Sequence, residues 1–599
     1  MWTSYYAKVA LLIIFELCHT SAALLATTGN SSPISRVSPE DWQALNKSVG
    51  GQLFATLPVG LPCYDNFNGE PRSPDEAACA NVVANKNNMT FLTTQVGGYT
   101  QGNWDICQST GIGCPLSPAK EIDPSQPCSQ GNLPLYYVNA SSVEDVQQTL
   151  RFAADRKVPI VVKNSGHDYK GRSAGAGSLA LWVNNYTPAP TLDKSFIPEG
   201  CSQSVGDVVT FGTGENFDGV YKFADQNNVT IIGGSAPTVR PGGGWISGGG
   251  HSPLSPVYGL GVDNVQQLRV VLPNGTYVTA NHCQNQDIFF ALRGGGGGTF
   301  GVIMEMSTLA RPQLTIQWTN ITFFGLDEEA QRQVLTVVVE NANSWFEYGW
   351  GGYIIPSATF PVWLMNPLLN AAAANASLQP LLDLATQLGA TIQVTTYQSF
   401  YQLYEEHIKN SEVARGGVGF AEASRLIPSK RLEGNVNQAA LTKMLLDVIS
   451  PTRPVTFRLM LLLTTPSRAT QDSDSAITPA WRSSTWHVII STSWDSSKTS
   501  VDQVDAILRN VTAAMDPLRY LTPGSGAYMN EGDTFEPDHI PAFWGKENYE
   551  RLRSIKQQMD PHNLMQVHQG VNYDASNPLF SCYPEIQKPV SQPEMVLEL

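Results

Sequence analysis

The chain of 599 residues is long enough to bury a large core and to form two or more domains. Hydrophobic residues make up 42% and charged residues 15%, a balance that excludes an intrinsically disordered chain. The formal net charge is −15 and no dense cluster of lysine or arginine occurs, so nucleic acids and anionic membrane surfaces are not expected partners.

The first residues have the profile of a secretory signal peptide. Lys8 precedes an apolar run over residues 9–15, and small residues follow at 21–23. No other apolar stretch approaches the roughly 20 residues of a membrane-spanning helix. We therefore expect residues 1–24 to be a signal peptide and the protein to be secreted, without a membrane span.

Cysteines and glycosylation sequons agree with this compartment. An even number of cysteines in a secreted chain indicates disulfides, although their spacing does not fix the pairing and does not resemble a zinc site. Asn-x-Ser/Thr sequons are glycan acceptors in secreted proteins. The cysteines after the signal are Cys63, Cys79, Cys107, Cys114, Cys128, Cys201, Cys283 and Cys582, and the sequons begin at Asn30, Asn46, Asn88, Asn139, Asn185, Asn228, Asn274, Asn320, Asn375 and Asn510.

Residues 25–130 differ in composition and periodicity from the chain that follows them. They are rich in proline, glycine, asparagine and cysteine and have few periodic segments. We expect a disulfide-tied N-terminal extension and not a separate catalytic unit.

An α+β pattern occupies residues 131–312. Ser142 and Asp145 form a helix cap that is followed by apolar residues at helical spacing. The sequence Pro-Asn-Gly at 273–275 predicts a hairpin between the strands that flank it. The expected strands are 135–138, 158–163, 178–183, 207–212, 230–232, 268–272 and 276–279, and the expected helices start at 142 and span 216–226 and 287–292.

The pattern changes between residues 313 and 515. Long strands alternate with helices there, which predicts a second domain with a sheet backed by helices. The expected strands are 314–324, 455–464 and 486–494, the expected helices are 328–341, 378–388 and 438–449, and the tail after 577 is expected to be irregular.

Two segments carry the signal for a cofactor. Residues 158–162 read as a buried strand that runs into a polar turn with His167 at its apex. Residues 233–252 are rich in glycine, which lets main chain approach a polyanion such as the pyrophosphate of a nucleotide cofactor. A flexible surface loop is the alternative. A GxGxxG pattern at 296–301 follows a helix-like segment, which argues against a Rossmann dinucleotide site, and no P-loop motif occurs.

Four blocks resemble flavin oxidoreductases of the vanillyl-alcohol oxidase / p-cresol methylhydroxylase superfamily. The resemblance is closest to the berberine bridge enzyme-like branch and its secreted fungal members, often labelled isoamyl alcohol oxidase-like. It implies a two-part FAD-binding domain of the p-cresol methylhydroxylase type, formed by 131–312 and 516–599, with residues 313–515 inserted as a substrate domain. The blocks are Gly-His-Asp-Tyr at 166–169, Pro-Thr-Val at 237–239 with 248–255, Asp-Ile-Phe-Phe-Ala-Leu-Arg at 287–293 with the glycines to 301, and Ala-Tyr-Met-Asn-Glu at 527–531 with 543–549.

The resemblance implies a covalent flavin. His167 stands where the family bonds a histidine to the flavin 8α-methyl carbon, and Ala236 stands where many members have a second, cysteine tether. We therefore expect FAD joined once, through His167, with a non-covalent flavin as the alternative. Val239 holds the place where family oxidases have a small residue, which implies oxygen as electron acceptor. The other expected cofactor-binding residues are Lys163, Asn164, Ser165, Gly166, Asp168, Gly243, Gly244, Ser247, Gly248, Gly249, His251, Val302, Tyr528, Asn530 and Asn563.

The catalytic base stays open among three residues. Tyr528 and Glu531 lie in the block that faces the ring in relatives, and His487 lies on the expected strand of the substrate domain. A strand histidine is more often structural. His562 and His568 lack a carboxylate pattern around them, so no metal is expected.

The resemblance implies a secreted, monomeric FAD-dependent oxidase. It would transfer a hydride from an alcohol or a secondary metabolite to the flavin and then electrons to oxygen, giving H2O2. Oxidative cyclisation or desaturation of a secondary metabolite, and a catalytically silent flavin-binding surface protein, are the alternatives.

Overall fold

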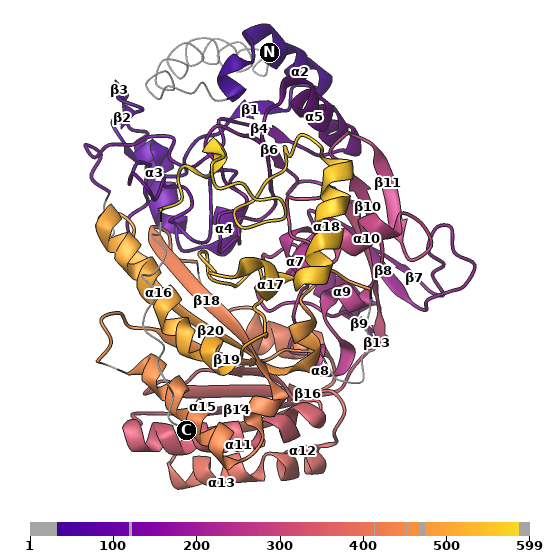
Figure 1. Cartoon of the computed structure of the whole chain (residues 1–599), viewed down its shortest axis with the longest axis vertical. Helices are drawn as coiled ribbons and strands as arrows, with labels where there is room; N and C mark the ends of the chain where they lie inside the picture. The colour runs from indigo at the N-terminus through magenta and orange to yellow at the C-terminus, as the bar shows by residue number, and fades with distance from the viewer. Residues whose placement is uncertain (1–32, 119–121, 412–413, 451, 467–473, 586–599) are drawn as a thin grey trace.

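The computed structural model describes residues 33–118, 122–411, 414–450, 452–466 and 474–585 (Figure 1). The expected signal peptide, the sequon at Asn30 and the end of the tail lie outside the described residues. Within these ranges, no helix combines the length and the apolar character needed to cross a membrane.

The first sheet places the turn that carries His167. Strands β4 (Tyr136–Asn139), β6 (Leu179–Trp182) and β5 (Ile160–Lys163) are parallel, and β1 (Leu53–Ala55) adds antiparallel to β4. Helix α5 (Val143–Arg156) connects β4 to β5 and buries its apolar face on the sheet. Ser142 and Asp145 form the expected capping box, with each side chain accepting a hydrogen bond from the other's main chain.

The second sheet is antiparallel and lies beside the first. Its order is β11-β10-β12-β8-β7. The hairpin expected around residues 273–275 is confirmed, because Val271 pairs with Tyr277 across the turn. Its strands are β7 (Thr191–Asp193), β8 (Val208–Gly212), β10 (Val265–Val271), β11 (Tyr277–Asn281) and β12 (Val302–Leu309); helices α6 (Phe217–Gln226) and α10 (Gln286–Leu292) and the pair β9 (Val229–Thr230) and β13 (Arg311–Pro312) complete this part.

The glycine-rich segment is not a flexible surface loop. It folds into short helical turns, and most of its residues are buried or half-buried. The turns are η4 (Pro241–Trp245) and α7 (Ile246–Gly248), and two further short helices, α8 (Ser255–Tyr258) and α9 (Gly261–Asn264), follow the segment.

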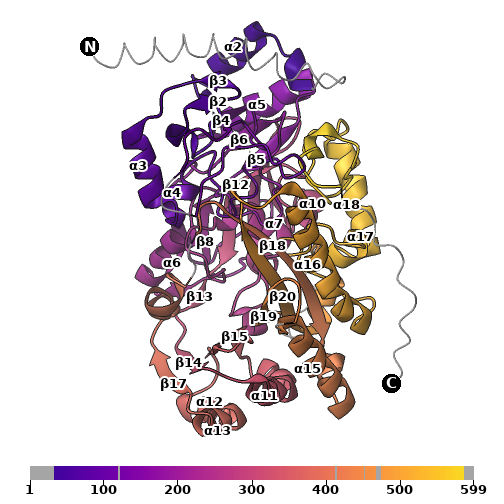
Figure 2. The ribbon, with the colours of Figure 1, turned by 90° about the vertical axis from the view of Figure 1, so that its left-hand side faces the viewer.

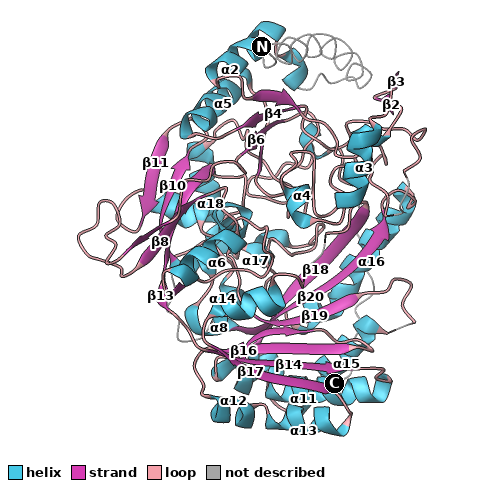
Figure 3. Cartoon of the chain, turned by 180° about the vertical axis from the view of Figure 1, so that it is seen from behind, coloured by secondary structure: helices cyan, strands magenta, loops and turns pink. Residues whose placement is uncertain are grey.

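The third sheet has seven antiparallel strands in the order β17-β14-β16-β15-β19-β20-β18 (Figure 3). Helices pack on one face of it, as expected, and Figure 2 shows α11 (Glu328–Glu347), α12 (Ala371–Ser377) and α13 (Gln379–Gln387) at the end of the molecule opposite α2 (Pro39–Ser48). The strands are β14 (Ile316–Phe323), β15 (Gly351–Ile354), β16 (Phe360–Asn366), β17 (Thr391–Tyr397), β18 (Val418–Pro428), β19 (Arg458–Leu463) and β20 (Ser484–Asp495).

Alternate residues of the central strands face the helices. Leu461 of β19 and Val488 of β20 belong to the core shared with α11, α15 (Asn435–Ile449) and α16 (Val501–Leu521). Their neighbours in sequence, Leu462 and Ile489, point to the opposite face. One face of this sheet therefore packs against the helices, and the other face points away from them.

The C-terminal residues return to the first two sheets through α17 (His539–Phe543) and α18 (Lys546–Met559). The expected boundary at residue 515 falls inside α16, which ends at Leu521. The tail as far as residue 585 includes the short turn η8 (Pro578–Phe580). Its residues Leu579, Phe580 and Tyr583 are buried in a cluster that includes Val161 of β5 and Ala180 of β6.

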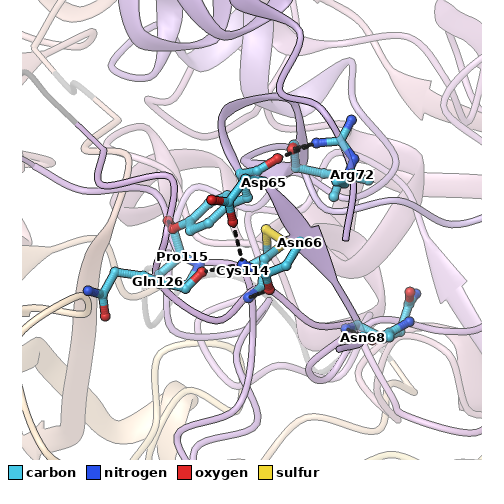
Figure 4. The surroundings of a disulfide bond; sticks show 11 residues. Asp65, Asn66, Asn68, Arg72, Cys114, Pro115 and Gln126 are labelled. Atoms are coloured by element: carbon cyan, nitrogen blue, oxygen red, sulfur yellow. Dashed lines mark hydrogen bonds between the residues drawn. A yellow bond between two sulfur atoms is a disulfide. The ribbon is translucent and has the colours of Figure 1, made fainter. Parts of the chain in front are cut away.

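The N-terminal extension is held by disulfides, as expected. It contains α3 (Glu76–Asn85), α4 (Met89–Thr93) and the short pair β2 (Asn66–Phe67) and β3 (Glu70–Pro71). Around Cys114, the main-chain N–H of Arg72 donates to the carbonyl of Asp65, and the Nδ2 of Asn66 donates to the carbonyl of Gln126 (Figure 4). Cys63–Cys79 and Cys114–Cys128 lie within the extension, and Cys107–Cys582 ties it to the tail, whereas Cys201–Cys283 lies outside the extension.

Candidate functional site

A cavity of about 1200 Å³ lies where the three sheets meet. Its walls are the turn after β5, the glycine-rich segment, the start of β12, the loop around Tyr528 and the helix-free face of the seven-stranded sheet. Of the residues predicted for the site, those that line the cavity are Asn164, Ser165, Gly166, His167, Asp168, Val239, Gly243, Gly244, Ser247, His251, Val302, Tyr528, Asn530 and Glu531. Those that do not are Lys163, Gly248, Gly249, His487 and Asn563.

His167 stands on the cavity wall as a neutral imidazole. Its Nε2 lies 2.7 Å from Oγ1 of Thr238. Burial, with a smaller contribution from the charge of Arg240, lowers the pKa of His167 to about 3. The ring therefore keeps a lone pair at neutral pH. Ala236 also lines the cavity and offers no sulfur for a second bond.

Asp168 locks the turn that presents His167. Its carboxylate accepts hydrogen bonds from Nε of Arg172 at 3.2 Å and from the main-chain N–H groups of Lys170 and Ser173. Arg172 also donates to Oδ1 of Asn530 at 3.1 Å. The turn and the loop around Tyr528 are thus held together.

Lys163 lies behind the turn and not in the cavity. Its ammonium group donates to the carbonyls of Gln95 and Gly98 at 2.9 and 2.8 Å and lies over the ring of Tyr99. Burial lowers its pKa to about 7. Lys163 therefore fastens the N-terminal extension against the turn. Residues 89, 100 and 101 of that extension line the cavity.

The glycine runs form a main-chain cradle at the cavity. A Cβ added to Gly244 would meet no atom within 4 Å and would project into open space, whereas one added to Gly297 would lie 3.1 Å from the Cα of Gly244. The two runs are therefore in contact, with bare main chain toward the cavity. Gly248 has a different role, because its Cβ would lie 2.3 Å from Nδ2 of Asn530. It provides room for that amide.

These residues fit the FAD that the resemblance implies. Nucleotide cofactors need close approach to main chain, which the cradle allows because a side chain at Gly244 would fill it. The buried Oδ1 of Asn164 and Nε of Arg240, both in the lining, lack hydrogen-bond partners among the described residues and are available to a polar ligand. Asn563 donates its amide to the carbonyl of Asn572 instead of reaching the cavity.

Tyr528 is buried and stays protonated. Burial, reinforced by the charge of Glu531, raises the pKa of Tyr528 above its ordinary value. Its hydroxyl accepts a hydrogen bond from Nδ2 of Asn530 at 2.7 Å, and the same amide donates to the carbonyl of Gly244 at 2.9 Å. The Tyr528 hydroxyl therefore keeps its proton and can donate a hydrogen bond.

Glu531 lies beside two histidines, His251 and His487, that are far from it in the sequence. Nε2 of His251 lies 3.1 and 3.2 Å from its two oxygens, and Nδ1 of His487 lies 3.7 Å from Oε2. Burial alone would raise the pKa of Glu531, but the charge of His251 and its hydrogen bond to the carboxylate outweigh burial and lower the pKa. Burial lowers the pKa of His487 to about 3. Glu531, with 18% of its side chain exposed, lines the cavity together with His251, whereas His487 does not.

The opposite wall is largely apolar and aromatic, and of its strands the sequence indicated only the one that carries His487, β20, as part of the cavity. Tyr353 and Trp363 stack with ring centroids 4.2 Å apart, and Phe420, Met460 and Ile489 lie on neighbouring strands. The hydroxyl of Tyr353 lies 2.7 Å from that of Ser235, next to the glycine-rich segment. Only the alternation along β15, β16, β18, β19 and β20 could have indicated these residues, and β15, β16 and β18 were not predicted as strands.

Comparison with known proteins agrees with the resemblance. Residues 134–281 match the family described as FAD binding domain, and residues 527–572 match the family described as berberine and berberine like. FAD-linked oxidoreductase ffsJ of Aspergillus flavipes is 34% identical over 574 residues, covering 88% of this chain and 91% of that protein. FAD-linked oxidoreductase OXR2 of Pyricularia oryzae is 32% identical over 586 residues, covering 95% and 99%.

Solved structures share the architecture. The VAO-type flavoprotein MtVAO615 from Myceliophthora thermophila C1 superposes with a TM-score of 0.79 at 27% identity, covering 91% of this chain and 96% of its own. A glucooligosaccharide oxidase from Acremonium strictum, at 20% identity and a TM-score of 0.60 over 73% of this chain and 92% of its own, shares the fold. The chain therefore belongs to the berberine bridge enzyme-like FAD-linked oxidoreductases of the vanillyl-alcohol oxidase type.

Proposed function

We propose that this protein is a secreted oxidase that removes a hydride from an alcohol carbon, or from the equivalent carbon of a secondary metabolite. When bound, FAD supplies the two-electron acceptor that oxygen reoxidises with formation of H2O2. The chain's own tasks are to hold the cofactor, orient the substrate and accept the substrate's proton. The observation that carries the proposal is a neutral His167 on the wall of a cavity that also has a main-chain glycine cradle.

His167 is proposed as the single covalent attachment point. Attachment would exchange a C–H bond of the flavin methyl group and the imidazole N–H for a C–N bond, and the two protons and two electrons released would pass to oxygen. This requires an uncharged imidazole, and the low pKa of His167 keeps it in that form. Ala236 removes the second tether. The alkyl side chain of Val239 lines the cavity without a polar group, which is compatible with access of oxygen.

Glu531 is proposed as the group that accepts the substrate's proton. Its carboxylate reaches the cavity next to the Tyr528 hydroxyl, and His251 fixes it with contacts to both oxygens. Tyr528 would orient the substrate by donating a hydrogen bond. His487 does not line the cavity, so it is proposed to position Glu531 from behind.

The apolar wall supports an organic substrate of moderate size. Stacked Tyr353 and Trp363 present flat surfaces next to aliphatic residues of β19 and β20. Such a surface suits a ring or a chain better than a strongly charged ion. The four disulfides support an extracellular location, and glycosylation and a monomeric state remain proposals.

The test begins with acid precipitation of the purified protein. We expect flavin colour to stay with the protein, to map to the peptide containing His167, and to be released from the His167→Ala variant. A panel of primary alcohols, sugars and secondary metabolites is then screened for peroxide. Glu531→Gln should lower the rate of anaerobic flavin reduction by about 10²–10⁴-fold, the usual contribution of a general base. Flavin that is freely removed from the wild-type protein by denaturation would refute the attachment.

A further inference from the structure

Three side chains from distant parts of the chain meet beside the cavity. His251 ends the glycine-rich segment, His487 lies on β20, and Glu531 follows α16 in the loop with Tyr528. One donor atom from each lies within 4.8 Å of the others. The separations from Glu531 are 3.1 Å to His251 and 3.7 Å to His487.

Burial leaves several nitrogens of this group without hydrogen bonds. Counting only the described part of the chain, both ring nitrogens of His487 and Nδ1 of His251 have no partner. His487 has no exposed surface, and His251 is 7% exposed. An unpaired polar group in such a position costs about 1–3 kcal/mol. The imidazole of His487, which has no hydrogen-bond partner on either nitrogen among the described residues, therefore points to a ligand that it binds.

We propose that His251, His487 and Glu531 form a binding site for a divalent transition-metal ion. Two imidazoles and one carboxylate are the ligand types that Zn²⁺, Fe²⁺ and Mn²⁺ accept. Two atoms bound to one Zn²⁺ at about 2.0–2.2 Å lie roughly 3–3.5 Å apart, so the separations from Glu531 require only small side-chain movements.

The remaining coordination positions face the cavity. His251 and Glu531 line it, whereas His487 closes the site from the sheet side. An ion held by these three residues would keep positions open for water or for an oxygen of a small molecule. The site is therefore of the open kind and not a closed structural one.

The ion would compete with the proposed chemistry. A carboxylate bound to a metal cannot accept a substrate proton, so Zn²⁺ should inhibit oxidation. This consequence rests on the proposed function, whereas metal binding does not.

The experiment measures binding without turnover. Flavin-loaded protein is freed of metal with a chelator and dialysed against micromolar Zn²⁺, and bound zinc is counted by elemental analysis. We expect one equivalent in the wild-type protein. A residue that binds the metal directly contributes at least as much to affinity as a residue that only hydrogen-bonds to a metal ligand. Glu531→Gln and His487→Leu should therefore raise the Kd for zinc by about 100-fold or more.

Two controls keep the outcome clear. His407→Ala removes a histidine that also lies beside a carboxylate, at 3.2 Å from Glu406, but outside the cavity, and it should bind zinc as the wild type does. The flavin absorbance and the unfolding temperature show which variants are folded, and Glu531→Gln preserves the shape of the side chain. Absence of stoichiometric zinc in the wild type, or equal binding in the folded Glu531→Gln variant, would overturn the site. Zinc that binds without slowing peroxide formation would support the site and contradict the role of Glu531 as base.

Discussion

Replacing Gly248 by alanine tests how the cradle is coupled to the loop around Tyr528. The new Cβ would lie 2.3 Å from Nδ2 and 2.5 Å from Cγ and Oδ1 of Asn530. Since non-bonded heavy atoms do not approach so closely, the amide of Asn530 must move away. That movement breaks its hydrogen bonds to Tyr528, Gly244 and Arg172, at 2.7, 2.9 and 3.1 Å.

The cost can be estimated from these contacts. Overpacking of a filled site costs about 1–3 kcal/mol, and each lost hydrogen bond adds about 0.5–1.5 kcal/mol. Partial relaxation of the loop will recover some of this. We expect the free energy of unfolding to fall by about 2–4 kcal/mol.

The assay is denaturant unfolding of the His167→Ala background after the flavin has been dialysed away. Gly244→Ala is the matched control, because its Cβ meets no atom within 4 Å and points into the cavity. It should leave the stability of the flavin-free protein unchanged and lower flavin uptake. A Gly248→Ala protein within about 0.5 kcal/mol of its parent, the usual range for surface substitutions, would refute the packing argument.

Three further predictions concern stability. Lys556→Met removes a buried ammonium group that lies 2.7 Å from the Asp560 carboxylate and from two main-chain carbonyls, so the free energy of unfolding should fall by about 3–5 kcal/mol in denaturant titrations. Replacing Cys107 and Cys582 together by serine should cost about 2–5 kcal/mol and expose the tail to limited proteolysis, and an uncut tail would contradict its anchoring role. Burial raises the pKa of Asp105 to about 8, so the folded state favours the protonated acid. The stabilisation that the protonated Asp105 gives the folded state is fully present below the unfolded pKa of about 4 and is lost as pH rises toward 8. The free energy of unfolding should therefore fall with a slope of at most about 1.4 kcal/mol per pH unit. Asp105→Asn should remove that slope in unfolding measured from pH 4 to 8, and an unchanged slope would assign it to other groups.

Local signals were sufficient where neighbouring residues decide the structure. The capping box of Ser142 and Asp145 starts α5 where expected, and the side chain of Asn216 accepts from the N–H of Gly219 at the start of α6. The Pro-Asn-Gly turn likewise fixes the register of β10 and β11. In each case the deciding contact spans only a few residues.

Elements were missed where packing overrides local preference. β18 has a glycine at its second residue and carries Glu422 and Arg425, yet it pairs along its whole length with β20. Pro517 argues against a helix at the end of α16, but the turn continues because Met515 and Leu518 are buried against the seven-stranded sheet.

The site was predictable only in the parts that motifs contain. His167 and its turn follow directly from one block of residues. His251 and Glu531 are 280 residues apart and meet only in the folded chain. Lys163 lies just before the first block and Gly248 within the second, but Lys163 fastens the N-terminal extension and Gly248 makes room for Asn530, so proximity to a motif did not define their role.

The seven-stranded sheet has a consequence for how this protein can evolve. Along β19 and β20, residues such as Leu461 and Val488 pack in the core shared with the helices, while the intervening Leu462 and Ile489 lie on the face that lines the cavity. Leu462 and Ile489 are themselves buried, so exchanges of similar volume change the cavity surface at the least cost to folding. Relatives that share one scaffold can therefore diverge toward different small molecules by exchanging every other residue of the same strands.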